Sequence, residues 1–122
     1  MNVRWLAPEI IKPPRGTTTV ESKPADVFAF AMLAIEVFTG RLPFEGQGNS
    51  VTAKRIFRGD RPEFPQNAED VGLTVPMWDF LQRCWDGDPT KRPSIDEVVT
   101  TWEGFLMNEG YVQRTLNTRV GF

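Results

Sequence analysis

One apolar segment constrains this sequence more than any other feature. Residues Lys23 to Thr39 are apolar at nearly every position, with Pro24 near the start and Gly40 just beyond the end. Proline suits the first turn of a helix, where its missing N–H would have no partner, and glycine suits the left-handed residue that ends one. The segment therefore predicts a helix buried on all sides. Its continuous apolar run, 27–35, is too short for a membrane span, which needs about 20 residues.

Proline and glycine divide the remaining chain into loops and shorter helices. The stretches 13–22 and 41–50 are polar and rich in these residues, which is typical of loops. A short helix is expected at 51–58, capped by Asn49 or Ser50. Its inward-facing residues are expected to be Val51, Ile56 and Phe57.

Two further helices are expected in the second half of the chain. Thr74 can cap one whose first turn holds Pro76, and Ser94 with Glu97 forms a capping box at the start of the other. The apolar face of the first is expected to contain Trp78, Leu81 and Trp85. The stripe of the second is expected to contain Ile95, Val98, Val99, Trp102 and Leu106. No segment alternates like a strand, so the predicted fold class is mainly α.

Composition excludes several classes of function. The chain has no histidine, which excludes Ser-His-Asp triads, Cys-His pairs and H-E-x-x-H zinc sites. Its single cysteine, Cys84, excludes an intrachain disulfide and is expected to be a buried structural thiol. A net charge of −2, with scattered basic residues, argues against nucleic acid as a partner. The N-terminal residues show no signal peptide, so we expect a cytoplasmic protein without membrane contact.

Two patterns resemble ligand-binding loops only superficially. Gly46 and Gly48 follow no strand and lack the further motif residues of a phosphate loop, so they predict a flexible loop. Four residues have the spacing of calcium-loop positions, namely Asp86, Asp88, Thr90 and Glu97. Because Lys91 stands where such a loop needs glycine, we expect the two aspartates to stabilise a turn instead.

Three charged residues occur in unusual surroundings. Glu9 lies in an apolar segment, Asp26 near the start of the apolar helix, and Arg92 between two turn prolines. A charge in such a setting usually needs a partner, and arginine is suited to a bidentate pair with a carboxylate. The residues alone leave open which carboxylate that is, and they equally allow three solvated surface charges.

The chain resembles the protein kinase family in five motifs that occur in the family's order. Residues 4–9, RWLAPE, resemble the A-P-E motif that closes the activation segment, and residues 23–30, KPADVFAF, resemble the start of the central helix. Residues 40–44, GRLPF, resemble the G-x-x-P-F that follows it. Residues 59–62, GDRP, and 84–94, CWDGDPTKRPS, are typical of tyrosine kinases and the tyrosine-kinase-like group.

This resemblance implies a fold and a domain organisation. Residues 1–107 are expected to form the helical subdomain of a kinase C-lobe, an incomplete domain, and residues 108–122 a C-terminal tail. Ala25, Ala29 and Ala31 depart from the family's usual Ser, Ser and Gly, so packing is preserved but two hydroxyls are lost. Whether the family member acts on Ser, Thr or Tyr is left open.

The resemblance also implies roles for individual residues. Glu9 and Arg92 are expected to form a structural ion pair that fastens the end of the activation segment. Asp26 is expected to anchor the backbone of the catalytic loop. Because an unpaired buried carboxylate is costly, Asp26 without that loop should reach solvent or take up a proton. The substrate-positioning loop is expected to contain Val3, Arg4 and Trp5.

The motifs that phosphoryl transfer requires are not found in this sequence. The family binds ATP and Mg and transfers the γ-phosphate to proteins, using G-x-G-x-x-G, V-A-I-K, H-R-D and D-F-G motifs that precede A-P-E. Here A-P-E begins at Ala7. We therefore expect a catalytically incompetent kinase-domain fragment without cofactors of its own. The alternative is a non-catalytic interaction module. The expected partners are a protein substrate, the missing kinase half or chaperones.

Overall fold

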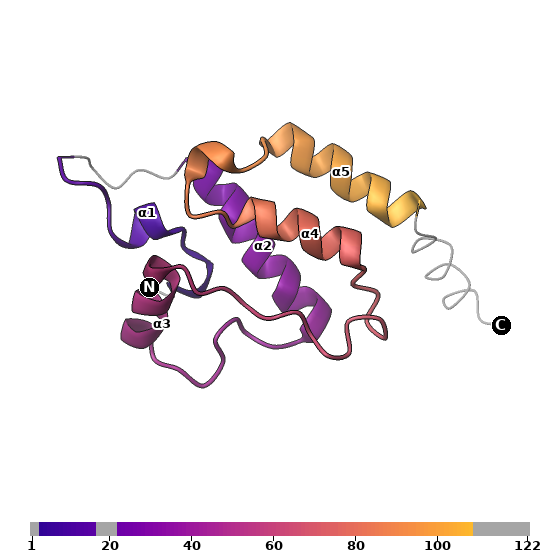
Figure 1. Cartoon of the computed structure of the whole chain (residues 1–122), viewed down its shortest axis with the longest axis horizontal. Coiled ribbons are helices and arrows are strands. Elements are labelled where there is room, and N and C mark those ends of the chain that lie inside the picture. The colour runs from indigo at the N-terminus through magenta and orange to yellow at the C-terminus, as the bar shows by residue number, and fades with distance from the viewer. Residues whose placement is uncertain (1–2, 17–21, 109–122) are drawn as a thin grey trace.

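The computed structural model describes residues 3–16 and 22–108. These residues form helices joined by loops, and they contain no strand, which confirms the mainly α prediction (Figure 1). The predicted tail, 108–122, lies outside the described residues apart from the backbone of Asn108. In chain order the elements are η1 (Val3–Trp5), α1 (Pro8–Ile11), α2 (Lys23–Thr39), α3 (Asn49–Arg58), α4 (Val75–Cys84), η2 (Pro89–Lys91) and α5 (Ile95–Asn108).

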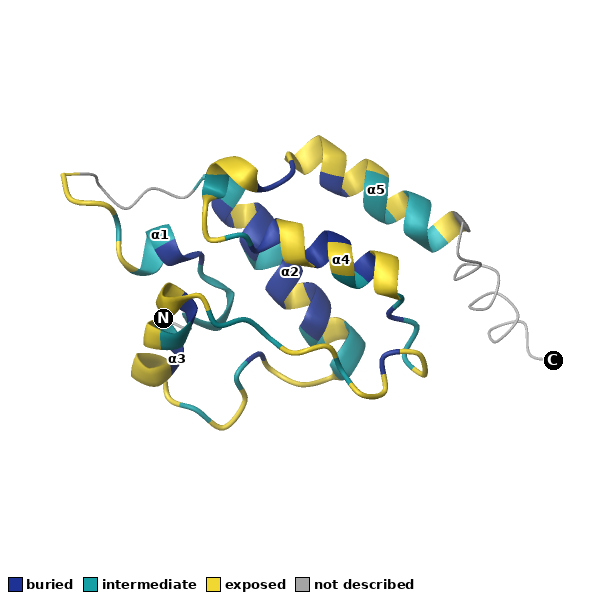
Figure 2. Cartoon of the chain, viewed as in Figure 1, coloured by how far each residue is buried: buried dark blue, intermediate teal, exposed yellow. Residues whose placement is uncertain are grey.

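Helix α2 forms the centre of the fold. The Ser22 hydroxyl accepts a hydrogen bond from the Ala25 N–H at 3.2 Å and caps the start of the helix. Gly40 has a φ of 71° and its N–H donates to the Glu36 carbonyl, as predicted for the residue that ends the helix. Helices α4 and α5 and the short elements η1 and η2 all pack against α2. Figure 2 shows the resulting buried stripe along it.

The prediction that α2 is buried on all sides was wrong. Leu33 is 49% exposed and Val37 is 72% exposed. The buried side chains come from the faces that α4, α5 and η1 cover, whereas these two residues project from the uncovered face. None of the helices in residues 3–16 and 22–108 has the length and apolar character that a membrane span requires.

Helix α3 also differs from the sequence prediction. Its N-cap is Gly48, not Asn49 or Ser50. Its inward face consists of Thr52 and Ile56, one turn apart. Of the three residues expected there, only Ile56 is buried, since Val51 is 52% exposed and Phe57 is 49% exposed. The reason is that α3 packs on α1 and η1 along one narrow face.

Helix α4 follows the prediction closely. The Thr74 hydroxyl accepts a hydrogen bond from the Met77 N–H at 3.2 Å, so Thr74 is the expected cap. The rings of Trp78 and Trp85 meet edge to face with centroids 5.2 Å apart, and Leu81 is fully buried. Helix α4 packs against α2.

Helix α5 is less buried than its apolar stripe predicted. The Ser94 hydroxyl accepts from the Glu97 N–H at 3.1 Å. The Glu97 carboxylate pairs with Arg83 at 3.2 Å, in place of the return bond to Ser94 that a full capping box requires. Val98 is buried, but Ile95 is 36% exposed and Val99 is 51% exposed, because both line an open groove with Val27 and Phe30 of α2. Trp102 and Leu106 are partly buried.

Candidate functional site

A tight turn after α4 positions the side chain of Arg92. The Asp88 N–H donates to the Asp86 carboxylate at 2.9 Å, and the Thr90 N–H and hydroxyl both donate to the Asp88 carboxylate, at 2.9 and 2.7 Å. The two aspartates therefore stabilise the turn, as predicted from the sequence. The hydrogen bonds from Thr90 hold the pKa of Asp88 below its usual value.

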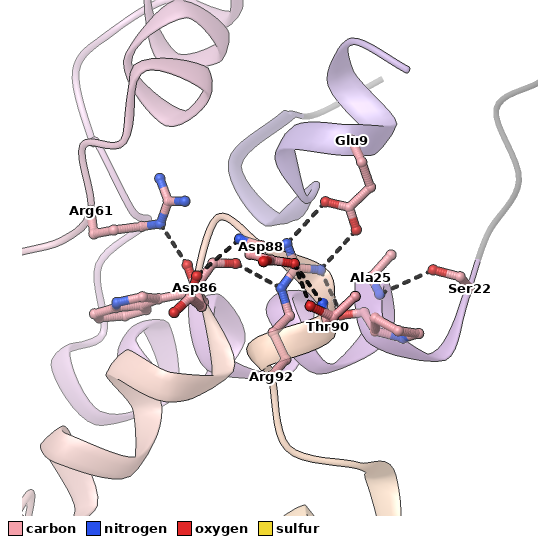
Figure 3. A network of polar contacts seen from close by, with 10 residues as sticks. Glu9, Ser22, Ala25, Arg61, Asp86, Asp88, Thr90 and Arg92 are labelled. Carbon is pink, nitrogen blue, oxygen red and sulfur yellow. Dashed lines mark hydrogen bonds and ion pairs between the residues drawn. The ribbon is translucent and has the colours of Figure 1, made fainter. Parts of the chain in front are cut away.

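Arg92 is the centre of a polar network that joins three segments of the chain (Figure 3). Its Nη1 lies 2.7 Å from Glu9 Oε2, and its Nη2 lies 2.9 Å from Glu9 Oε1, which is a bidentate ion pair. Nη1 also donates to the Pro24 carbonyl at 2.9 Å, and Nε donates to the Asp86 carbonyl at 2.8 Å. The guanidinium thereby ties α1 to the start of α2 and to the turn after α4.

This ion pair is shielded from solvent. The Arg92 side chain is completely buried, and that of Glu9 is 20% exposed. Burial alone would raise the pKa of Glu9. The hydrogen bonds from Arg92 and the positive charge of its guanidinium outweigh that effect and hold the pKa below its usual value. Glu9 is therefore a carboxylate at neutral pH, held in one position.

A second arginine, Arg61, belongs to the same region. Its Nε donates to the Trp85 carbonyl at 2.9 Å, and its Nη1 donates to the carbonyls of Ile56 and Asp60, each at 2.8 Å. These bonds connect the loop after α3 to the end of α4. Burial, reinforced by the charge of Arg92, lowers the pKa of Arg61.

Phe28 lies against both arginines. The Cζ atoms of Arg61 and Arg92 are 5.0 and 5.1 Å from the centroid of its ring, which is fully buried. An aromatic face attracts a cation, so one ring helps to accommodate two buried positive charges. The sequence patterns predict no role for Arg61. The available signal was its place directly before Pro62, which matches Arg92 before Pro93.

The predicted substrate-positioning residues form the 3₁₀ helix η1. This element packs against α2 and α3. Arg4 donates to the Gln47 carbonyl and, at 3.4 Å, to the Asn49 side chain. Trp5 packs against the core. The loop that contains Val3, Arg4 and Trp5 is thus held by the residues around the start of α3 and by the core.

Asp26 is placed apart from the Arg92 network. It lies in the first turn of α2, where a carboxylate is favourable next to the helix N-terminus, and it is exposed. Within the described residues its carboxylate makes no hydrogen bond or ion pair, so the expected solvent exposure is confirmed. The described residues also hold no cluster of three or more His, Cys, Asp or Glu side chains arranged for a metal ion.

Comparison with known proteins identifies the family. The family model described as protein tyrosine and serine/threonine kinase matches residues 1–102. This chain belongs to that kinase family. The match contains the Glu9–Arg92 pair, Arg61 and Phe28, so the network described above lies within the kinase-related region.

Individual kinases support this assignment. The chain is 34% identical over 103 residues to the dual specificity protein kinase pyk3 of Dictyostelium discoideum. The aligned region covers 84% of this chain and 7% of that protein. It is 33% identical over 100 residues to the serine/threonine-protein kinase VIK of Arabidopsis thaliana. The aligned region covers 82% of this chain and 21% of that protein. The chain thus spans a small part of the length of these relatives.

Proposed function

We propose that this chain is the helical, C-lobe part of a kinase domain and that it acts as a scaffold for protein phosphorylation. The observation that carries this proposal is the bidentate pair of Arg92 with Glu9, together with the bond from Arg92 to the Pro24 carbonyl. These bonds fasten the segment around α1, which resembles the end of an activation segment, to the central helix α2. A rigid platform of this kind positions a substrate and carries out no chemistry.

The residues of this platform have distinct proposed roles. Asp26 anchors the backbone of the catalytic loop, which its exposed position in the first turn of α2 supports. The loop that contains Val3, Arg4 and Trp5 forms a wall beside the substrate residue. The contacts of Arg4 with Gln47 and Asn49 support this role, because they hold the loop in place.

We infer that these 122 residues do not transfer phosphate by themselves. Phosphoryl transfer in kinases needs a phosphate-positioning lysine, metal ligands and a base in the motifs G-x-G-x-x-G, V-A-I-K, H-R-D and D-F-G. None of these motifs occurs in the 122 residues, and the absence of histidine by itself excludes H-R-D. ATP and Mg are therefore assigned to the complete domain of the family.

Calorimetric titration of the purified 122-residue protein with Mg-ATP tests this inference. We expect no heat of binding at micromolar protein and nucleotide, with a complete kinase domain as the positive control. Micromolar affinity would contradict the inference. The scaffold role has a separate test, because Arg92→Ala in a complete domain should weaken protein phosphorylation more than it weakens ATP binding.

A second candidate function is a non-catalytic interaction module derived from a kinase lobe. The observation in its favour is an apolar groove of about 340 Å³ beside the exposed Leu33 and Val37, with Trp102 in its wall. An exposed apolar surface marks a partner site or an aggregation risk. Size-exclusion chromatography discriminates the two candidates, since a stable monomer favours the module and aggregates favour the scaffold part of a larger domain.

Finer assignments follow from the same residues. The segment 84–94 supports membership of the tyrosine-kinase-like group, and the buried free thiol of Cys84 supports a reducing, cytoplasmic environment. The proposed partners are a protein substrate, the remaining half of the kinase domain and chaperones. Nucleic acid and membranes are not among them.

A further inference from the structure

A groove on the surface between α1 and α3 combines positive charge with apolar side chains. The two helices pack against each other, and the outward side of α3 is exposed (Figure 2). The groove has a volume of about 370 Å³. It is lined by Ile11, Lys12, Ala53, Lys54, Phe57 and Arg58.

All the charged residues that line this groove are positively charged. Three of its six lining residues are basic, and none is acidic. Arg58 shares the carboxylate of Asp60 with Arg55, at 2.9 and 3.0 Å, so two arginines face a single negative charge. Lys12 and Lys54 form no ion pair with any residue in 3–16 or 22–108. This local excess of positive charge occurs on a chain with net charge −2.

The apolar part of the groove is centred on Phe57. Phe57 is 49% exposed, whereas α3 turns Thr52 and Ile56 inward. Lys12 Nζ lies 5.2 Å from the centroid of the Phe57 ring, which places a cation directly beside an exposed aromatic surface. A ligand that fits must therefore present negative charge around an apolar side chain.

We propose that the groove between α1 and α3 binds an acidic segment of another protein, in which carboxylates flank an apolar side chain. The apolar side chain lies against Phe57 and Ile11, and the carboxylates pair with Lys12, Lys54 and Arg58. Charge complementarity selects this occupant, because a purely apolar partner would leave the lysines without counter-charges. This binding requires only the groove residues and does not depend on the scaffold role proposed above.

Fluorescence anisotropy with the 122-residue protein tests the proposal. The probe is a fluorescein-labelled peptide of alternating Glu and Gly with a central Leu-Phe pair. Lys12→Gln/Lys54→Gln should weaken binding by roughly fivefold or more, and Phe57→Ser should weaken it as well. The matched control is Arg41→Gln/Lys91→Gln, which removes the same charge at exposed positions outside the groove and should change affinity by less than about twofold.

Further measurements keep the test decisive. Circular dichroism establishes that each variant is folded, and raising NaCl from about 50 to 300 mM should weaken binding of the unaltered protein, since exposed ion pairs are screened. Equal loss of affinity in the groove and control variants would overturn the proposal. It would also be overturned by absence of peptide binding to the unaltered protein, by equal binding of a peptide with Ser-Ser in place of Leu-Phe, or by tighter binding of a single-stranded oligonucleotide.

Discussion

Arg92 and Glu9 are 83 residues apart in sequence, and their side chains form a bidentate ion pair with N–O distances of 2.7 and 2.9 Å. The Arg92 side chain is completely buried, so its positive charge is compensated by the Glu9 carboxylate and by hydrogen bonds to two backbone carbonyls instead of by water. Desolvation of two charges is costly, and only good geometry with further hydrogen bonds compensates for it. The main effect of the pair is consequently to fix the position of α1 against α2. Its net contribution to stability is smaller.

Removing one partner of this pair should be strongly destabilising. Arg92→Ala is expected to lower the free energy of unfolding by more than ~2 kcal/mol, because it leaves the Glu9 carboxylate partly buried without its cation. Urea unfolding followed by tryptophan fluorescence measures the change. The matched control is Arg83→Ala, which breaks the exposed pair with Glu97 and should cost less than ~1 kcal/mol. A change below ~0.5 kcal/mol for Arg92→Ala would show that the pair is solvated.

Stability should decrease in acid. The pKa of Glu9 in the folded protein lies below its usual value of 4.5, so the unfolded chain binds the proton more tightly. Its contribution is complete above the usual value and is lost as the pH falls through the lowered pKa of the folded state. Urea midpoints at pH 7, 5, 4 and 3 measure this trend.

The variant Glu9→Gln provides the control for the acid dependence. It should show a smaller loss of stability between pH 5 and 3, because its side chain does not titrate. Part of the loss should persist, since hydrogen bonds from Arg58 and Thr90 likewise lower the pKa values of Asp60 and Asp88. Identical pH profiles for the variant and the unaltered protein would contradict the assignment to Glu9.

Phe28 should contribute far more to the free energy of unfolding than Phe57, a phenylalanine on α3. Phe28→Ala is expected to cost ~3–5 kcal/mol, because it leaves a cavity and removes the ring against which Arg61 and Arg92 lie. Phe57→Ala is the matched control, and with a 49% exposed side chain it should cost less than ~1 kcal/mol. Comparable losses in chemical denaturation would argue against this core.

The thiol of Cys84 should be unreactive in the folded protein. It is fully buried, and burial raises its pKa to about 12, so almost no thiolate exists near pH 8. We expect its reaction with a water-soluble maleimide at pH 8 to be at least ~100-fold slower in the folded protein than in guanidinium chloride. Mass spectrometry of timed samples measures both rates. Rapid labelling without denaturant would indicate that the end of α4 opens.

Several local features were predictable because they depend on residues near one another in sequence. Thr74 and Ser94 cap their helices, and Gly40 ends α2, since these roles need only a hydroxyl or a glycine at the right step of the chain. The turn made by Asp86 and Asp88 has the same local origin. The kinase family could likewise be identified from the order of short motifs.

The orientation of helix faces was harder to predict. Val51 and Phe57 on α3 and Val99 on α5 have the spacing of a buried face, yet each is about half exposed. Apolar spacing shows which residues share a face, but the neighbouring helices determine how much of that face is covered. For α3, contact with α1 and η1 selects the pair Thr52 and Ile56.

The sequence by itself determined the helical fold class, the local caps and turns, and the family. The reason is that helix propensity, capping and the kinase motifs each depend on short segments of the chain. The residues alone left open which carboxylate pairs with Arg92, and the resemblance to kinases implied Glu9. Only the tertiary structure shows how the charged side chains meet. Arg92 meets Glu9 across 83 residues, Arg61 joins the same region, and both lie against Phe28. Such contacts depend on how α1, α2 and α4 pack in three dimensions, and no local pattern contains that information.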